Sequence, residues 1–180
     1  MKIKETNIEG LVVIESTIYK DSRGYFFESY NQGAHAEAGL SHTFVQDNQS
    51  KSSYGVIRGL HLQSEPHAQT KLVRVLEGAI FDVAVDLRKG SSSYGKWFGL
   101  EISDENNLQL LIPKGFAHGF SVLSETATVF YKCDVLYHPE SELGIKFDDA
   151  DLAIDWMIPS DKVCVSEKDK ILPSFGSFLG

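Results

Sequence analysis

The stretch AIFDVAVDLR, residues 79–88, alternates between two kinds of side chain with a period of two. Its odd-numbered positions are all apolar, whereas its even-numbered positions carry Asp82, Asp86 and Arg88 beside Ile80 and Ala84. This period is typical of a β-strand, in which successive side chains point to opposite faces of a sheet. The apolar face predicts contact with a dry core, and the other face predicts contact with water or with a polar cavity.

Strand signals of this kind follow one another along most of the chain. Clusters of Gly, Ser, Asn and Asp separate them, as expected for turns between short strands. The expected strands are 11–17, 25–30, 55–63, 71–76, 79–87, 97–103, 108–113, 127–137 and 144–148. Only 32–39 and 148–156 have helical character, and both are short. The pattern predicts an all-β fold, a barrel or sandwich of antiparallel strands with a few short helices, formed by residues 1–180 as one domain.

The composition restricts the classes of partner. Hydrophobic residues make up 42% and charged residues 23% of the 180 residues, which is typical of a globular domain. The formal net charge of -8 disfavours nucleic acid, whose binding needs a basic face, but leaves a small anionic ligand open. We see no apolar signal region and no apolar run near the roughly 18 residues of a membrane span, so we expect no membrane partner and a cytoplasmic location. Cys133 and Cys164 are predicted to be free thiols.

The stretch GVIRGLHLQ, residues 55–63, has the apolar residues of a buried strand but also carries Arg58 and His61. Unpaired charge in a core is costly, so this strand either runs at an edge or lines a polar cavity. An unbroken strand would place the two residues on opposite faces, because three positions separate them. If both serve one cavity, a bulge or twist near Gly59 must turn one of them.

Polar residues recur inside several of the β-like stretches. Each has an ordinary structural explanation by itself, but a small barrel with so many inward polar groups is able to hold one small ligand in its mouth. These residues are Arg23, Glu28, Gln46, Asn48, Arg58, His61, Gln63, Lys71, Asp82, His118 and Tyr131. A metal ion is not expected, because there is no His-x-His pattern and two isolated histidines give too few ligands.

Seven segments resemble, in order and at the family's spacing, the deoxythymidine diphosphate (dTDP)-4-dehydrorhamnose 3,5-epimerases. They are DSRGYFFE (21–28), QDNQSKSSYGVIRGLHLQ (46–63), QTKLVRVLEGAIFDVAVDLRKGSSSYGKW (69–97), IPKGFAHGF (112–120), VFYKC (129–133), YHPESELGIKFDD (137–149) and SEKD (166–169). RGLH, KLVRV and GFAHGF are highly specific together, whereas any one alone would be weak. Leu62 stands where the family commonly has an aromatic residue. The family fold implied by this resemblance is a cupin-type jelly roll.

The resemblance implies an isomerase that inverts C3 and C5 of dTDP-4-dehydro-6-deoxy-D-glucose, giving dTDP-4-dehydro-L-rhamnose for dTDP-rhamnose biosynthesis. Both carbons flank the C4 ketone, so loss of either proton gives an enolate. The chemistry needs a base, an oxyanion stabiliser and an acid on the opposite face. The resemblance assigns the base to His61 with Asp169 as its partner, the stabiliser to Lys71 and the acid to Tyr131. No cofactor is expected, because the proton returns to the carbon that it left.

The resemblance also implies a set of substrate-binding residues. Arg23, Arg58 and Lys168 are candidates for the diphosphate, and Phe26 for stacking on thymine. Further contacts are implied for Glu28, Gln46, Asp47, Asn48, Lys71, His118 and Glu142. His118 is expected to neutralise charge on the substrate. Asp82 is expected either to hold Lys71 or a histidine by a buried ion pair or to have a plain structural role. In the family, N-terminal strands of a partner complete the nucleotide pocket, which implies a homodimer with an interface near residues 23–28.

Three other functions compete with this hypothesis. A monoepimerase that acts at C3 or C5 of a related 4-keto nucleotide sugar shares most of the same motifs. A metal-dependent barrel oxygenase or isomerase is disfavoured by the missing His-x-His pattern. A barrel that only binds sugar would not require His61, Lys71, Tyr131 and Asp169 together.

Overall fold

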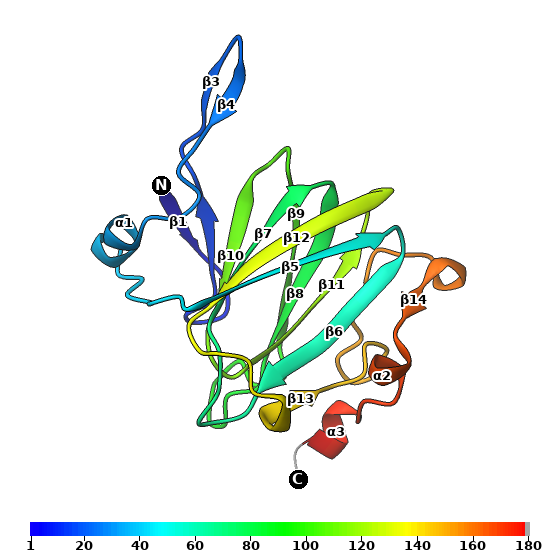
Figure 1. Cartoon of the computed structure of the whole chain (residues 1–180). Helices are drawn as coiled ribbons and strands as arrows, with labels where there is room; N and C mark the ends of the chain where they lie inside the picture. Colours follow the sequence, from blue (N-terminus) through cyan, green and yellow to red (C-terminus); the bar gives the residue numbers. More distant parts are fainter. Residues whose placement is uncertain (179–180) are drawn as a thin grey trace.

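The structure is a computed structural model that describes residues 1–178, and strands dominate it (Figure 1). The strands are β1 Lys2–Glu5, β2 Val12–Glu15, β3 Tyr19–Asp21, β4 Gly24–Phe26, β5 Gln46–Ser53, β6 Val56–Gln63, β7 Lys71–Glu77, β8 Ala79–Asp86, β9 Trp97–Ser103, β10 Leu108–Ile112, β11 Phe116–Val122, β12 Thr126–Cys133, β13 Glu142–Gly144 and β14 Cys164–Val165. The helices are α1 Gln32–Glu37, α2 Glu167–Lys170 and α3 Phe175–Phe178, with 3₁₀ turns at Pro139–Ser141 and Ser160–Lys162.

Two antiparallel sheets face each other across an interior core. The first has the strand order β1-β2-β10-β7-β12-β5, and the second has the order β13-β6-β11-β8-β9. The short strand β14 adds to β6 in the parallel direction. The predicted all-β architecture of antiparallel strands with a few short helices is therefore confirmed.

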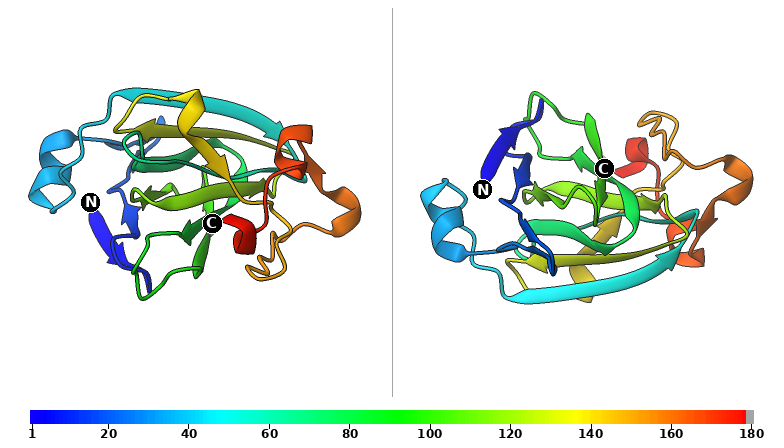
Figure 2. Two further views of the ribbon diagram at one scale, coloured as in Figure 1. Left: turned by 90° about the horizontal axis from the view of Figure 1, so that it is seen from below. Right: turned by 90° about the horizontal axis from the view of Figure 1, so that it is seen from above.

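Strand β8 carries its side chains alternately into two cores. Ile80 and Ala84 face the interior core between the sheets. Val83 and Val85 face an outer core, which the C-terminal segment covers with residues that include Trp156. Figure 2 shows this segment, in orange and red, along one side of the barrel. The apolar face of β8 is thus dry as predicted, and its polar face points into the barrel, where Asp82 is fully buried.

Strand β6 contains the irregularity that the sequence predicts near Gly59. Arg58 pairs with Phe120 of β11, but His61, three residues further on, pairs with His118, only two residues back. The extra residue in β6 lets both Arg58 and His61 line one cavity. A Cβ atom on Gly59 would lie 2.6 Å from the Gly119 Cα, so the close approach of the two strands requires glycine here.

The hairpin β3–β4 projects away from the barrel (Figure 1). Every residue of its two strands is exposed, and neither strand pairs with another described strand. Helix α1 follows this hairpin, as predicted, and starts where the Asn31 side chain accepts a hydrogen bond from the Ala34 N–H. We call residues 19–26 the arm.

Several expected elements are wrong or displaced. Residues 145–148 are not a strand, because only β13, ending at Gly144, pairs with β6. Residues 148–156 do not form a helix; they form turns, with the Asp149 carboxylate accepting the N–H groups of Asp151 and Leu152. The expected strands at 25–30 and 127–137 end at Phe26 and Cys133. Strands β1, β3, β5, β11 and β14 were not predicted.

Candidate active site

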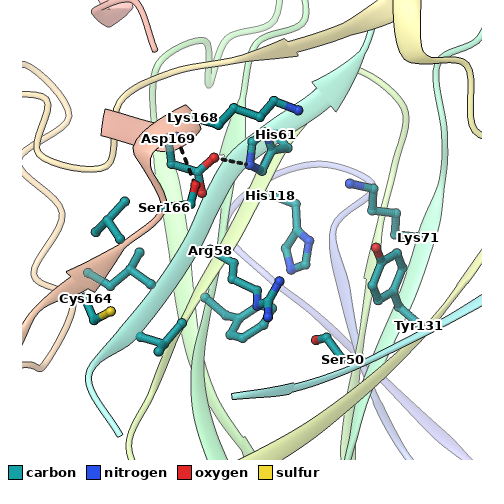
Figure 3. A pocket seen from close by; sticks show the side chains of 14 residues that line it. Ser50, Arg58, His61, Lys71, His118, Tyr131, Cys164, Ser166, Lys168 and Asp169 are labelled. Carbon is teal, nitrogen blue, oxygen red and sulfur yellow. Dashed lines mark hydrogen bonds and ion pairs between the residues drawn. The ribbon is translucent and has the colours of Figure 1, made fainter. Parts of the chain in front are cut away.

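A cavity of about 480 Å³ opens between the two sheets beside the C-terminal segment. Seven of the predicted site residues line it together, although they come from four strands and from helix α2 (Figure 3). They are Arg58, His61, Lys71, His118, Tyr131, Lys168 and Asp169. We call this space the central cavity.

The imidazole of His61 is held by a carboxylate from the far end of the chain. Its Nε2 lies 2.9 Å from the Asp169 Oδ1, and the other Asp169 oxygen accepts the Gly59 N–H at 3.2 Å. Ser166 caps the short helix that carries Asp169. Nδ1 of His61 is buried and has no hydrogen-bond partner among the described residues. The ring therefore has one nitrogen fixed by Asp169 and one left to accept a proton.

The pKa of His61 is lowered from its ordinary value by burial, and Asp169 and Glu142 oppose this shift only in part. The imidazole is consequently neutral near pH 7, which is the form that a general base requires. Glu142 approaches the second ring nitrogen, with its Oε1 3.5 Å from the His61 Nδ1.

Glu142 also collects two donors at the edge of the cavity. Its Oε2 accepts hydrogen bonds of 2.7 Å from the Lys168 Nζ and from the Tyr137 hydroxyl. Although burial acts to raise it, these two donors bring the pKa of Glu142 below its ordinary value. Glu142 is therefore a carboxylate that ties Lys168 and Tyr137 to the wall next to His61.

Lys71 and Tyr131 stand on the opposite sheet from His61, on β7 and β12. The Lys71 Nζ lies 6.0 Å from the centroid of the Tyr131 ring. Burial lowers the pKa of Lys71, while Cys133, Asp82 and Glu142 act to raise it. Burial raises the pKa of Tyr131, so its hydroxyl keeps its proton near neutral pH.

His118 forms a second histidine–carboxylate pair, in the interior of the barrel. Its Nε2 lies 2.6 Å from the Asp82 Oδ1, and both residues are buried. The expected contact of Asp82 with a histidine is therefore present. His118 lies in the middle of strand β11 and faces the central cavity.

An adjoining cavity of about 340 Å³ shares His61, Lys71 and Tyr131 with the central cavity. It adds Gln46, Asn48 and Glu142 from the predicted binding set. Asp47, between Gln46 and Asn48, lines neither cavity; its exposed side chain pairs with Lys132 at 2.9 Å. The alternation of β5 explains this outcome, because Asp47 points to the opposite face from its neighbours.

The structure does not bring the predicted arm residues to either cavity within the described chain. Arg23 is exposed and pairs with Asp21 on the same hairpin. The exposed fraction of Phe26 is 70%. Glu28, just after the hairpin, accepts a hydrogen bond from the Asn31 side chain at 3.0 Å. These three residues thus carry no contact with the cavity wall of their own chain.

Some lining residues were missed by the sequence reasoning. Ser50 lines the central cavity, and Ser52 accepts a hydrogen bond from the Arg58 Nε at 3.0 Å. Both share the inward face of β5 with Gln46 and Asn48, so the alternation of residues 46–53 was the signal for them. Tyr137 lines the adjoining cavity. Cys133 and Cys164 are free thiols, as predicted.

Residues 1–178 contain no cluster of three or more His, Cys, Asp or Glu side chains suited to a metal ion. In the same part of the chain, no helix is long and apolar enough to cross a membrane.

The arrangement can perform proton transfer at carbon on both faces of one ligand. A neutral imidazole held by a carboxylate stands on one sheet, and a protonated phenol stands on the other, with the half-buried ammonium group of Lys71 beside it. Base, acid and cation on opposite walls are the elements for removing a proton next to a carbonyl and returning it from the other side. The fold and the site together define a barrel isomerase of the epimerase class.

Comparisons with known proteins identify the family. Residues 5–177 match the family model described as dTDP-4-dehydrorhamnose 3,5-epimerase. A curated protein of that name from Methanothermobacter thermautotrophicus is 53% identical over 167 residues, which cover 92% of this chain and 90% of that protein. The crystal structure of the Elizabethkingia anophelis enzyme is 54% identical with a TM-score of 0.94, covering 98% of this chain and 97% of that one. The chain belongs to the dTDP-4-dehydrorhamnose 3,5-epimerase family, and its barrel is a cupin-type jelly roll.

Two further structures bear on the ligand. The Legionella pneumophila dTDP-6-deoxy-D-glucose-3,5-epimerase, in complex with dTDP-4-keto-L-rhamnose, is 49% identical with a TM-score of 0.93 and covers 97% of this chain and 93% of its own. A 3'-monoepimerase from Streptomyces bikiniensis is only 31% identical, with a TM-score of 0.88 over 95% of this chain and 86% of its own. The chain is accordingly an isomerase of the nucleotide-sugar epimerase type.

Proposed function

We propose that the chain inverts both C3 and C5 of dTDP-4-dehydro-6-deoxy-D-glucose to give dTDP-4-dehydro-L-rhamnose, with no cofactor. The observation that carries this proposal is the placement of His61 and Tyr131 on opposite sheets of one cavity, with Lys71 on β7, the strand next to that of Tyr131. The high identity with 3,5-epimerases over nearly the whole chain favours the same substrate class and a place in dTDP-rhamnose biosynthesis.

The reaction proceeds by proton transfer at each carbon in turn. His61 takes the proton from C3 or C5 on its unpartnered Nδ1, and the electron pair of the broken C–H bond moves to the C4 oxygen as an enolate. Lys71 stabilises that oxygen, where a cation in a water-poor cavity is most effective. The enolate then collapses as Tyr131 gives its proton to the opposite face of the same carbon. Asp169 fixes the His61 ring and stabilises the imidazolium that forms.

The binding residues divide between the cavity and the arm. Arg58 and Lys168 supply positive charge at the central cavity, and His118 supplies a ring nitrogen, which suits a diphosphate and a substrate oxygen. Gln46, Asn48 and Glu142 contact the sugar or base from the adjoining cavity. Asp47 is not among the side chains that we assign to the substrate.

We assign the arm, with Glu28 just after it, a role in a homodimer. Arg23, Phe26 and Glu28 have no cavity to serve in their own chain, yet the arm carries exposed cationic and aromatic groups suited to phosphate and thymine. We assign them to the cavity of a partner copy. One domain per chain and a cytoplasmic location remain predictions.

The deciding experiment follows the 4-keto sugar nucleotide by proton NMR in heavy water. We expect the C3 and C5 signals to disappear and the product to have both centres inverted, because the same base and enolate oxygen serve both carbons. Exchange at C3 alone, with a singly inverted product, would assign the chain to the 3'-monoepimerase type. Absence of exchange at both carbons would overturn the proposal.

A further inference from the structure

The barrel contains two histidine–aspartate pairs, and the proposed mechanism uses only one of them. The His61–Asp169 pair has a half-buried imidazole at the cavity wall next to the C-terminal segment. The His118–Asp82 pair lies deeper: the exposed fraction of Asp82 is 0% and that of His118 is 6%. The two histidines are nevertheless neighbours, since His118 is the register partner of His61. A buried carboxylate is costly unless charge or hydrogen bonds compensate for it, so Asp82 calls for a specific explanation.

Only one of the two carboxylate oxygens of Asp82 has a hydrogen-bond partner among the described residues. Its Oδ1 lies 2.6 Å from the His118 Nε2, whereas its Oδ2 is buried without a hydrogen-bond partner among residues 1–178. By contrast Asp86, on the same face of the same strand and also fully buried, uses both oxygens, binding Arg88, Ser91 and Ser93. Asp86 is thus fully compensated by its own loop, and Asp82 is compensated only by groups that line the cavity.

Those groups are His118 and Lys71. His118 contacts Asp82 directly and lies in Figure 3 between His61 on one side and the Lys71 and Tyr131 side chains on the other. The negative charge of Asp82 acts to raise the pKa of Lys71. With Nε2 turned to Asp82, the imidazole of His118 presents Nδ1 as the nitrogen available to a ligand in the cavity.

We propose that Asp82 is a positioning residue, which fixes the His118 ring with its Nε2–H directed at the carboxylate and, by its negative charge, keeps Lys71 an ammonium group beside the enolate oxygen. Asp82 touches no substrate atom itself; it acts through His118 and Lys71. This inference rests on the proposed function, because it names the groups that stabilise the enolate of that reaction. It also explains why a carboxylate is buried here with no hydrogen bond to its Oδ2, because its negative charge stabilises the ammonium form of Lys71.

Stabilisation of the C4 oxygen affects both reacting carbons. The C4 oxygen is common to the enolates formed at C3 and at C5, so weakening its stabilisation slows both exchanges by the same factor. A group that contacted only one face of the sugar would slow them unequally. Equal slowing is therefore specific for action at the shared oxygen.

The charge of Asp82 also affects how the reaction rate depends on pH. Lys71 stabilises the enolate only when protonated, and the negative charge of Asp82 raises the pKa of Lys71 against the effect of burial. Removal of that charge lowers this pKa, so the loss of rate on the alkaline side begins at a lower pH. Cys133 and Glu142 also act to raise the pKa of Lys71. The other titratable or charged groups that line the central cavity are Arg58, His61, His118, Tyr131, Cys164, Lys168 and Asp169, and none of these is substituted in the test.

The test is Asp82→Asn, which keeps the shape and an oxygen acceptor for the His118 N–H but removes the charge. We expect kcat to fall by roughly 10- to 100-fold, a smaller loss than the 10²–10³ typical of deleting a donor to an oxyanion. C3 and C5 exchange should slow equally, KM should change little, and the alkaline limb should move to lower pH. Asp86→Asn is the matched control, in which unfolding temperature falls while the pH profile of the folded enzyme stays as in the wild type. An unchanged pH profile in Asp82→Asn, or unequal slowing, overturns the inference.

A second measurement does not depend on how the variant folds. Nitrogen-15 NMR of the histidine rings in the wild-type protein, with dTDP bound, reports the protonation of each ring nitrogen. We expect the His118 Nε2 to carry the proton that it donates to Asp82, and His61 to be neutral at pH 7. A His118 whose Nε2 carries no proton contradicts the inference even if Asp82→Asn cannot be prepared. Failure of the wild-type enzyme to exchange either proton would instead remove the proposed function, and the two failures are therefore distinguishable.

Discussion

The central cavity and the arm differ in how completely one chain builds them. His61, Lys71, His118 and Tyr131 lie on strands that pair with neighbours on both sides, so the sheets fix their positions. Arg23 and Phe26 lie on a two-stranded hairpin that pairs with no other described strand (Figure 1). An isolated hairpin is marginally stable in water. The proton-transfer groups are thus prearranged within the chain, whereas the arm reaches neither cavity of its own chain.

This difference separates rate from affinity. Groups fixed in the cavity wall are able to act on the transition state, and their loss should reduce kcat. Groups on the arm contribute binding that is the same in the ground state and the transition state, and their loss should raise KM. Substitutions in the two regions therefore test the comparison directly.

The largest effect is expected for His61→Asn. Asparagine keeps a similar polar shape but has no basic nitrogen, so neither C3 nor C5 should exchange with solvent. Loss of one general base costs about 10²–10⁴ in rate, while the dissociation constant for dTDP should stay near the wild-type value. Proton NMR in heavy water measures the exchange, and calorimetric titration measures the binding.

His42→Asn provides a matched control. His42 is also half-buried near a carboxylate, with its Nδ1 4.0 Å from Asp134, but it lines neither cavity. This variant should exchange both protons at the wild-type rate. If C3 or C5 of the substrate exchanged with solvent at the wild-type rate in His61→Asn, a second base would be present. His61 would then not be the base for both carbons.

A smaller and more selective effect is expected for Tyr131→Phe. The aromatic ring stays, so packing against the interior core should survive, but the phenolic proton donor is lost. His61 still removes and returns protons on its own face. We expect exchange to continue while net inversion falls by about 10²-fold or more, as seen by comparing NMR washout with product analysis.

Tyr94→Phe serves as the control for removal of a hydroxyl. Tyr94 packs against Phe175 with ring centroids 5.6 Å apart and lies outside both cavities. In Tyr94→Phe, solvent exchange and net inversion should both proceed at the wild-type rates. Full inversion by Tyr131→Phe would exclude Tyr131 as the acid.

Strands were predicted correctly where apolar and polar residues alternate clearly. Strands in which both faces are polar, or both are apolar or small, were not predicted. AIFDVAVDLR reads as a strand because each face has a distinct character. Strand β5, QDNQSKSS, is polar on both faces, and β11, FAHGFSV, is apolar or small at almost every position because both its faces are buried. The false helix at 148–156 has apolar residues at helical spacing, but Asp149 binds three N–H groups, including that of Phe175, and holds the segment in turns.

The site was predicted unevenly for a similar reason. Parity alone indicated a bulge at Gly59, because Arg58 and His61 could not otherwise share a cavity. The pairing of His61 with Asp169, 108 positions later in the sequence, came from the family resemblance, since no local pattern links residues so far apart. Asp47 was grouped with its neighbours although the alternation of β5 turns it outward. The role proposed for the arm, a contact between chains, likewise came from the family resemblance and not from a local pattern.

The smallest single effect is expected for Arg23→Ala on the arm. Loss of one charged hydrogen bond to a phosphate, worth about 1.5 kcal/mol, raises KM roughly tenfold. The value of kcat should change less than about twofold, because the cavity wall is untouched. Lys4→Ala is the matched control: Lys4 is likewise an exposed cation paired with a nearby carboxylate, Glu15, but lies on β1. Steady-state kinetics of the two variants would give this contrast.

Mixing the arm variant with the base variant shows which cavity the arm serves. A mixed dimer of Arg23→Ala and His61→Asn contains one intact His61, in the chain whose own arm is defective. If the arm reaches into the partner's cavity, that intact His61 meets an intact Arg23, and one site of the two regains the wild-type KM. At substrate concentrations well below KM, activity should then rise several-fold above that of the Arg23→Ala protein at the same number of intact His61 residues. If each arm served its own chain, no mixed dimer would contain a complete site, and activity would not rise. That result would refute the exchange of arms while leaving the cavity chemistry intact.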